Sequence, residues 1–224
     1  MVDAPVADDL DAAVAWLAGG GLLAYPTETV WGLGADARST DAVARLRAFK
    51  ERGDAAPISI LVSGIDAVAG LGLRAGAPAR RLAGHFWPGP LTLVLPGEVA
   101  LAPGVARRDG AVGVRCSSHP GARALAVACA RAGVGPLTAT SCNRSGESAA
   151  TTRAEAEAVC GSGGAAPHLL RVPDSHASES PGSVPACGSA STVVDLTGER
   201  PIVLRWGALG SEQLSPIIEE LAAA

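Results

Sequence analysis

Short apolar runs of strand length alternate with helix-patterned segments along the whole chain, and this alternation restricts its fold more than any other feature. Apolar runs predict strands at residues 22–25, 58–62, 91–95, 112–115, 137–140, 168–172, 191–196 and 201–206. Helical spacing, capping residues or a leading proline predict helices that begin near residues 10, 40, 78, 120 and 153, and a C-terminal helix through residues 214–221. We therefore expect one α/β domain over residues 1–224, with a twisted mixed β-sheet flanked by helices.

The composition limits the class of protein. The 224 residues, 48% of them hydrophobic, are enough for one sizeable core. The net charge is -4, so no overall positive field favours nucleic acid. No apolar run reaches the ~18 residues of a membrane span, and the acidic N-terminal region lacks the basic segment of a signal peptide. The sequence predicts a soluble, cytoplasmic protein that does not cross a membrane.

The cysteines show no metal-binding or redox pattern. Their number is odd, there is no C-x-x-C, and none pairs with a histidine at zinc-finger spacing. We interpret all of them as buried free thiols, and no metal site is predicted. They are Cys116, Cys129, Cys142, Cys160 and Cys187.

The first polar cluster follows the first predicted strand. Residues 22–25 read as a buried strand that Pro26 ends, because proline has no N–H for a ladder. Thr27, Glu28 and Thr29 come directly after it. Two hydroxyls and a carboxylate at the end of a strand suit hydrogen bonding to a small polar substrate. A polar turn that caps the next element explains them equally well.

Cationic and polar side chains recur at the ends of other predicted elements, namely Lys50 and Arg52, Arg115, Ser141 and Asn143, and Arg205. Arginine binds phosphate oxygens through a planar fork and lysine as a point charge, so the set could cradle a triphosphate. Taken singly, Lys50 and Arg52 could belong to a connection that we expect to be solvated, and Ser141 and Asn143 could be turn formers. Arg205 in an apolar strand is harder to explain in this way, because an unpaired cation there is costly.

The usual nucleotide and hydrolase motifs are missing. There is no G-x-x-x-x-G-K-[ST], no G-x-G-x-x-G after a strand and no G-x-S-x-G elbow. Any ATP site must therefore use a different cradle, and a hydrolase triad is unsupported.

Several motifs together resemble one family, the threonylcarbamoyl-AMP synthases, also called the YrdC-like or TsaC family. The matching segments are YPTETVWGLG at 25–34, KER at 50–52, FWPGPLT at 86–92, VGVR at 112–115, SCN with RSG at 141–146, STVVD at 191–195 and VLR at 203–205. They stand in family order and cover about residues 8–210. The chain is similar to the short members, which lack an extra C-terminal domain.

The resemblance implies an enzyme that combines L-threonine, bicarbonate and ATP into threonylcarbamoyl-AMP and releases pyrophosphate. Partner proteins would then transfer the threonylcarbamoyl group to tRNA, which this chain would meet only indirectly. By motif match, the phosphates would be held by Lys50, Arg52, Ser141 and Asn143, with Lys50 and Arg52 catalytic and Arg205 also at the nucleotide. Threonine would be held by Thr27, Arg115 and Ser191, and magnesium would enter on the triphosphate.

The chain departs from the family pattern at three places. Cys116-Ser117-Ser118-His119 stands where the family usually shows a Pro-Asp-His-like run, Cys142 replaces an alanine, and Trp206 replaces a proline or acidic residue. Two other functions therefore stay open. One is a paralogue that makes a carbamoyl-adenylate of a different amine or uses carbamoyl phosphate, and the other is a non-catalytic RNA-binding module.

A long segment without periodicity, residues 173–190, is rich in Ser, Gly and Pro and leads into Ser191. Loops of that length in compact domains are usually functional or disordered. We expect a lid over the active site, the alternative being a passive surface loop.

Overall fold

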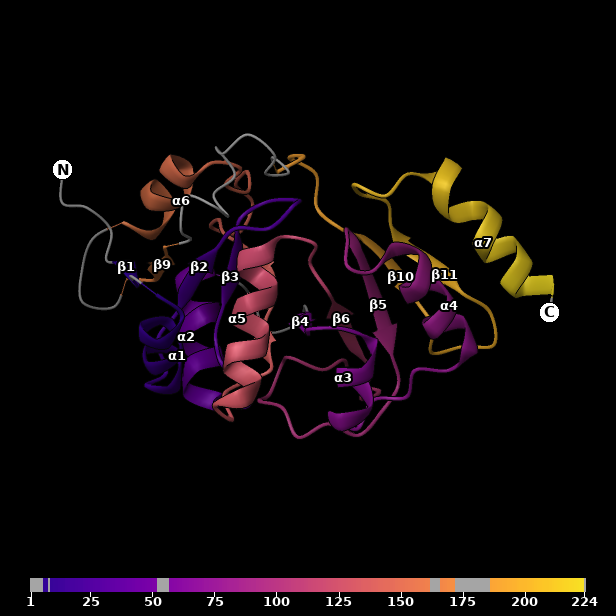
Figure 1. The fold of residues 1–224 in the computed structure, drawn as a ribbon, viewed down its shortest axis with the longest axis horizontal. Coiled ribbons are helices and arrows are strands. Elements are labelled where there is room, and N and C mark those ends of the chain that lie inside the picture. Colours follow the sequence, from indigo (N-terminus) through magenta and orange to yellow (C-terminus); the bar gives the residue numbers. More distant parts are fainter. Residues whose placement is uncertain (1–5, 8, 52–56, 162–165, 172–185, 224) are drawn as a thin grey trace.

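The structure, a computed structural model, describes residues 6–7, 9–51, 57–161, 166–171 and 186–223. Within these residues two mixed β-sheets are flanked by seven helices (Figure 1). The predicted α/β class is confirmed. The strands are divided between two sheets, whereas the sequence predicted one.

The smaller sheet is covered on both faces. Its five strands, in spatial order, are β1 (Val6–Ala7), β9 (His168–Leu170), β2 (Leu23–Tyr25), β3 (Gly32–Gly34) and β8 (Thr140–Ser141). Helices α1 (Leu10–Ala18) and α5 (Pro120–Arg131) pack with Leu23 and Tyr25, whereas α2 (Thr40–Lys50) and α6 (Arg153–Cys160) pack with Ala24 and Leu33. Because both faces of β2 are buried, its sequence is continuously apolar.

The larger sheet is covered by helices on one face. Its six strands, in spatial order, are β11 (Ile202–Arg205), β10 (Thr192–Asp195), β5 (Leu91–Leu95), β6 (Val112–Arg115), β4 (Ile60–Leu61) and β7 (Leu137–Thr138). Helices α3 (Ile65–Gly70), α4 (Ala77–Phe86) and α7 (Ser211–Ala223) contribute to one core with Leu93, Val114 and Val194. Successive side chains of a strand point to opposite faces, so Thr92 and Val94 lie on the other face.

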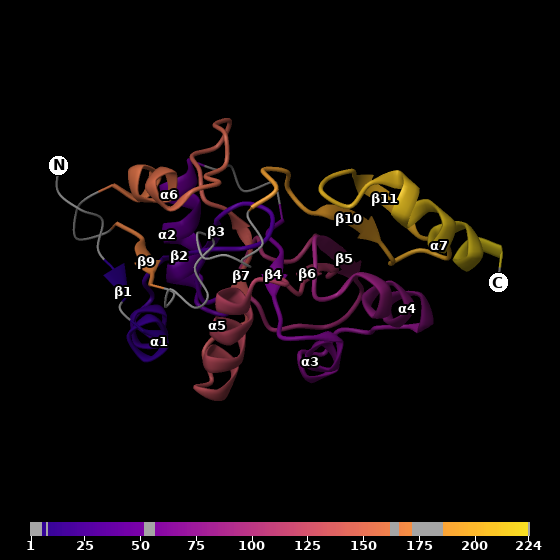
Figure 2. The same ribbon diagram turned by 45° about the horizontal axis from the view of Figure 1, so that its top comes forward.

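The two sheets meet where the predicted strand at 137–140 divides in two. Leu137–Thr138 pairs with β4 in the larger sheet, and Thr140–Ser141 pairs with β3 in the smaller one. Thr138 joins them further, because its N–H donates to the oxygen of Ala35 at 2.8 Å and its Oγ1 accepts from the nitrogen of Ala35 at 2.9 Å. Figure 2 shows the sheets side by side, with the C-terminus beyond the larger one.

Local signals at the helix ends are largely confirmed. The sequence Thr152-Arg153-Ala154-Glu155 predicts a capping box, and α6 has it, with Thr152 and Glu155 bonded reciprocally. For the helix that begins near residue 40 the sequence predicts Thr40 as the cap, and this is wrong by one residue: α2 is capped by Ser39, whose hydroxyl accepts from the nitrogen of Ala42 at 3.2 Å. In the part of the chain that the structure describes, no helix is long and apolar enough to cross a membrane.

All five cysteines are free, as predicted, and four of them are buried. The prediction of burial is wrong for Cys187, which is exposed. Sequence composition cannot distinguish that residue, because its exposure depends on where the segment after 185 crosses the fold. Among the described residues no group of three or more His, Cys, Asp or Glu side chains could hold a metal ion.

Candidate active site

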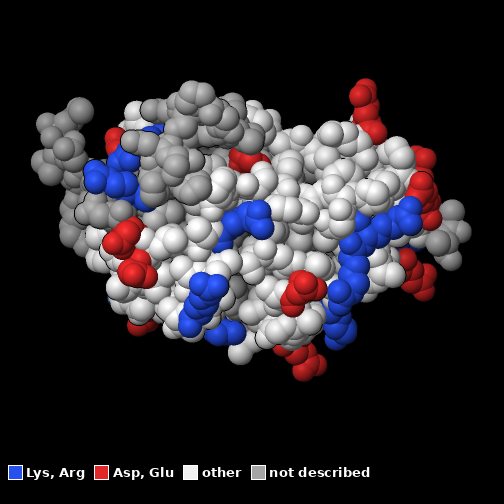
Figure 3. Space-filling view, in the orientation of Figure 1, with Lys and Arg blue, Asp and Glu red and all other residues white. Residues whose placement is uncertain are grey.

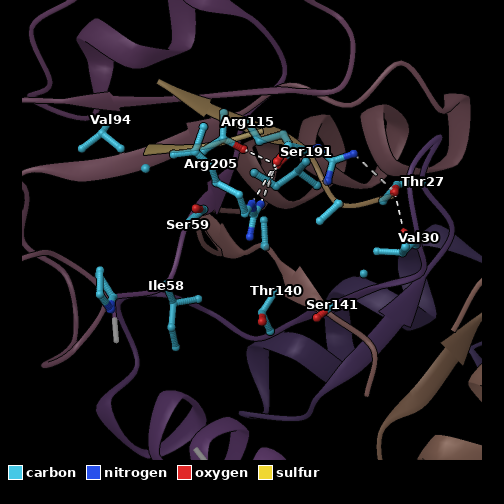
Figure 4. A pocket seen from close by; sticks show the side chains of 18 of the residues that line it. Thr27, Val30, Ile58, Ser59, Val94, Arg115, Thr140, Ser141, Ser191 and Arg205 are labelled. Carbon is cyan, nitrogen blue, oxygen red and sulfur yellow. Dashed lines mark hydrogen bonds between the residues drawn. The ribbon is translucent and has the colours of Figure 1, made fainter. Parts of the chain in front are cut away.

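A cavity of about 300 Å³ lies between the two sheets (Figure 4). The smaller sheet contributes the end of β2, the loop after it and β8. The larger sheet contributes the face that the helices leave uncovered, on β5, β6, β10 and β11. Of the predicted site residues, those that line this cavity are Thr27, Arg115, Ser141, Ser191 and Arg205.

Arg115, the last residue of β6, is held by the loop that follows β2. Its Nη2 donates to Glu28 Oε1 at 3.0 Å and to the hydroxyls of Thr27, at 3.4 Å, and Thr29. The loop after β2 therefore supplies three acceptors to one guanidinium. Arg115 Nε is buried and has no hydrogen-bond partner among the described residues. A buried, unsatisfied N–H beside a cavity suits an anionic ligand such as a carboxylate.

Glu28 is buried, and it is ionised despite that burial. Removal from water alone would raise the pKa of its carboxyl. The positive charge of Arg115 and the hydrogen bond that Ser117 donates to Oε2 outweigh the burial, so the pKa of Glu28 lies below its ordinary value. The pair Glu28–Arg115 is thus a buried salt bridge inside the site.

A second cation approaches the cavity from the neighbouring edge of the larger sheet. Arg205, the last residue of β11, donates through Nη2 to the backbone oxygen of Ser191 at 2.8 Å and to its hydroxyl at 3.3 Å. The Ser191 hydroxyl also lies 2.8 Å from the Thr92 hydroxyl. Burial and the charge of Arg115 both lower the pKa of Arg205. The guanidinium groups of Arg115 and Arg205 therefore lie at the same cavity, which favours negative charge between them.

The other predicted phosphate ligands contact one another directly behind Ser141. Lys50 Nζ donates to the backbone oxygen of Asn143 at 2.9 Å, to Asn143 Oδ1 at 2.6 Å and to the backbone oxygen of Ser141 at 2.5 Å. The Ser141 hydroxyl donates to Asn143 Oδ1 at 2.7 Å. Lys50 and Asn143 are not part of the cavity wall. Lys50 thus connects the end of α2 to the 141–143 segment, which contributes Ser141 to the cavity wall.

The expectation that Lys50 stands on a solvated connection is wrong, because its side chain is buried and only 3% of the residue is exposed. Helix α2 continues to Lys50, and the 141–143 segment covers its ammonium group. The expectation rested on the neighbouring charged residues, whereas the burial comes from a segment about ninety residues later. Arg52 and most of the predicted lid, residues 172–185, lie outside the described residues.

Several further polar residues of the cavity were not singled out in the sequence, among them Thr92 and Arg107. Thr92, the second residue of β5, is the one polar residue of that otherwise apolar strand, and this interruption is visible in the sequence. Arg107 lies in a loop and forms an ion pair with Asp195 at 2.5 Å. Its position next to the cavity follows from tertiary contacts alone.

The close approach of two loops behind Ser191 requires a glycine at position 207. A Cβ there would overlap the backbone oxygen of Ala190 and lie 2.7 Å from the carbonyl carbon of Ser191. We expect Gly207→Ala to lower the free energy of unfolding by about 1–3 kcal/mol, as for other overpacked sites, and to displace Ser191. Urea denaturation and a crystal structure of the variant measure both effects. Gly210→Ala is the matched control, since its Cβ would meet no atom within 4 Å; equal effects of the two substitutions would contradict the steric account.

Comparison with known proteins identifies the family. Residues 15–207 match the Sua5/YciO/YrdC family model, which is described as "Telomere recombination". The chain is 34% identical over 212 residues to a putative threonylcarbamoyl-AMP synthase of Mycobacterium tuberculosis (strain H37Rv), covering 95% of this chain and 90% of that one. It is 41% identical over 152 residues to the threonylcarbamoyl-AMP synthase of Xanthomonas campestris pv. campestris (strain B100), covering 67% and 79%.

Solved structures agree with the sequence match. P. abyssi Sua5 complexed with L-threonine superposes with a TM-score of 0.80 at 31% identity over 94% of this chain. The present chain spans 57% of that longer protein. E. coli YciO has a TM-score of 0.73 at 20% identity, which supports the fold alone. The match from residue 15 to residue 207 and the relatives that cover nearly the whole chain lead to one conclusion: this chain belongs to the Sua5/YciO/YrdC family.

Proposed function

We propose that the chain is a nucleotidyltransferase that makes threonylcarbamoyl-AMP and pyrophosphate from L-threonine, bicarbonate and ATP. The observation that carries the proposal is the convergence of Arg115 and Arg205 on one cavity between the sheets. Such a cavity suits two anionic substrates, an amino acid and a triphosphate. The names of the relatives, and the L-threonine bound to P. abyssi Sua5, support the same assignment.

Within this proposal Arg115 binds the carboxylate of threonine, with the hydroxyls of Thr27 and Ser191 on either side of the amino acid. Arg205 and Ser141 face the nucleotide from the cavity wall, and by motif match Asn143 and Arg52 complete the set of phosphate ligands. Lys50 holds Ser141 and Asn143 in place and adds positive charge behind them. Five of these side chains line the cavity, which supports a shared site.

The reaction needs positioning and charge neutralisation more than it needs a protein nucleophile. The amine of threonine attacks the carbon of carbon dioxide, which forms from bicarbonate by loss of hydroxide, and it gives up a proton to become a carbamate. A carbamate oxygen then attacks the α-phosphorus of ATP. The bond from that phosphorus to the bridging oxygen of the β-phosphate breaks, and pyrophosphate leaves with that electron pair. Arginine side chains near the phosphates stabilise the charge that develops.

Magnesium would enter with the triphosphate as part of the substrate. The described residues contain no cluster of three or more acidic, histidine or cysteine side chains, and magnesium in nucleotide enzymes is often held largely by phosphate oxygens and water. No protein carboxylate is therefore assigned to the ion.

The proposed reaction is tested by pyrophosphate release. We expect release from ATP to require both threonine and bicarbonate, because the carbamate forms only from the two together. A panel of amino acids, with and without bicarbonate, measures the requirement. Release without bicarbonate would contradict the mechanism. Equal release with serine, glycine or another amine, or use of carbamoyl phosphate, would instead favour the paralogue.

The product would be consumed by proteins that transfer the threonylcarbamoyl group to tRNA, so that the chain meets tRNA indirectly and works in the cytoplasm. An RNA-binding module without chemistry is less well supported. On the face shown in Figure 3 the basic side chains lie in separate groups, several of them beside acidic ones. RNA-binding surfaces usually present a continuous basic groove with stacking aromatic rings, and strong salt-dependent RNA binding would revive that alternative.

A further inference from the structure

Two buried side chains, Ser117 and Glu28, lead to the largely buried Arg115 at the cavity. Ser117 is fully buried two residues after Arg115, in the connection from β6 to α5. Its hydroxyl donates to Glu28 Oε2, and Glu28 Oε1 accepts from Arg115 Nη2. One carboxylate therefore joins a serine to the arginine that borders the cavity.

The direction of the serine hydroxyl is fixed by its second contact. Ser117 Oγ accepts the backbone N–H of His119 at 3.2 Å. A hydroxyl has a single proton, and with its oxygen occupied by that N–H the proton is free to serve Glu28. Both oxygens of Glu28 are thus used, one by Ser117 and one by Arg115.

Arg115 keeps one N–H group, at Nε, that none of these contacts uses. Nη2 is committed to the acceptors of the loop after β2, whereas the buried Nε has no partner among the residues that the structure describes. A guanidinium is planar, so fixing Nη2 fixes the direction of Nε as well. A ligand carboxylate that accepts a hydrogen bond from Nε requires that direction to be held.

From this geometry we propose that Glu28 and Ser117 are positioning residues: Ser117 orients the carboxylate of Glu28, and Glu28 holds Arg115 in the orientation that receives the carboxylate of the amino-acid substrate. The proposal rests on the function proposed above for its substrate, but the orientation of Arg115 can be measured without turnover. Ser117 stands in the Cys116–His119 segment, which departs from the pattern of the family that the sequence resembles.

The kinetic test uses Glu28→Gln, Ser117→Ala and the double variant, with Ser118→Ala as the matched control. Ser118 is only partly buried and is the next residue in the chain. We expect Ser117→Ala to raise the KM for threonine about fivefold and Glu28→Gln to raise it about tenfold or more, because each removes a charge-assisted hydrogen bond. The KM for ATP and kcat should change less than twofold. Ser118→Ala should leave all three constants unchanged.

The double variant separates action through Glu28 from two independent effects. If Ser117 acts only through Glu28, the double variant should match Glu28→Gln within about twofold, since coupled residues are not additive. Multiplied effects, or equal rises in the two KM values, would overturn the proposal. Thermal unfolding of each variant checks that the fold persists.

The orientation of Arg115 is read from the NMR relaxation of its Nε–Hε group in the protein without substrates. We expect a rigid Nε–Hε vector in the wild type and a mobile one in Glu28→Gln and Ser117→Ala. An equally rigid vector in the variants would refute the positioning role even if the kinetics changed. If the wild type does not use threonine, the proposed function fails, and this measurement still decides the role of Glu28 and Ser117.

Discussion

Replacing Lys50 with alanine is expected to abolish most turnover and also to destabilise the protein. Its ammonium donates to three oxygens of the 141–143 segment, which would be left without those bonds in a buried place. Hydrogen bonds to charged groups contribute roughly 1.5–3 kcal/mol each in mutational series, although not additively, so we expect a loss of about 2–4 kcal/mol in unfolding free energy. Turnover should fall at least about 100-fold, because Ser141 would lose its support beside the nucleotide.

Separate variants distinguish the fold from the chemistry at Lys50. Lys50→Met retains the aliphatic stem and should recover part of the stability but little of the turnover. Arg45→Ala, on the same helix, is the control: it removes an exposed cation with one hydrogen bond, to the oxygen of Gly20, so it should lower the unfolding free energy by about 1 kcal/mol and leave turnover unchanged. Urea denaturation and pyrophosphate release measure the two quantities. Near wild-type turnover in Lys50→Met would contradict any role of the ammonium.

Lys50 is the only lysine in the sequence, which permits a direct measurement. Protein labelled with ¹⁵N-lysine should give one side-chain Nζ resonance, protected from exchange by its three acceptors. A large shift of that resonance on ATP binding would indicate that a phosphate oxygen replaces one of the 141–143 oxygens as a hydrogen-bond acceptor of the ammonium. A small shift would assign Lys50 to support of the segment.

Replacing Arg115 with methionine is expected to produce the second large effect. The variant leaves Glu28 as a buried carboxylate without its cation, and removing one partner of a buried ion pair costs about 3–5 kcal/mol. Threonine should no longer saturate the enzyme, with its KM raised about 100-fold or more, because its carboxylate loses a charged partner. Arg123→Ala, on the exposed side of α5, is the control.

The double variant Glu28→Gln/Arg115→Met separates stability from binding. It removes both charges, so it should recover much of the lost stability while threonine binding stays lost. Recovery of threonine use in the double variant would show that Arg115 does not bind the carboxylate. Chemical denaturation and the KM for threonine decide between these outcomes.

The pH dependence of stability gives an independent check on this pair. The pKa of Glu28 in the folded wild type lies below the ordinary 4.5, so its stabilising contribution is present above that value and is lost as the pH falls through the folded pKa. In Arg115→Met burial acts without the compensating cation, and the carboxyl is destabilising at neutral pH until it is protonated. The stability difference between the two proteins should therefore begin to narrow above pH 4.5, as the carboxyl of the variant is protonated, and should go on narrowing below pH 4.5 until the wild-type Glu28 is protonated too. A difference independent of pH would contradict an ionised, paired Glu28.

The sequence by itself determined those elements whose signals are local. Residues 91–95 and 112–115 were predicted with the bounds that β5 and β6 have, because Pro and Gly punctuate short apolar runs. The capping box of α6 was equally readable, since a cap and its partner lie three residues apart. Strand β3 was missed because Gly-Leu-Gly has almost no strand propensity, and it forms only because β2 and β8 lie on either side of it.

For the candidate site, too, some residues were indicated by the sequence and others only by the tertiary structure. Motifs at the ends of strands indicated Thr27, Arg115, Ser141, Ser191 and Arg205, and the fold brings these to one cavity. Only the tertiary structure decided that Lys50 is buried behind Ser141 and that Ser117 supports Glu28 from a separate loop. It also divided residues 137–140 between the two sheets, because hydrogen-bond partners distant in sequence, such as Ala35 for Thr138, set which sheet a strand joins. Local sequence specifies which residues can bond, whereas burial and partner choice depend on contacts between segments far apart in the chain.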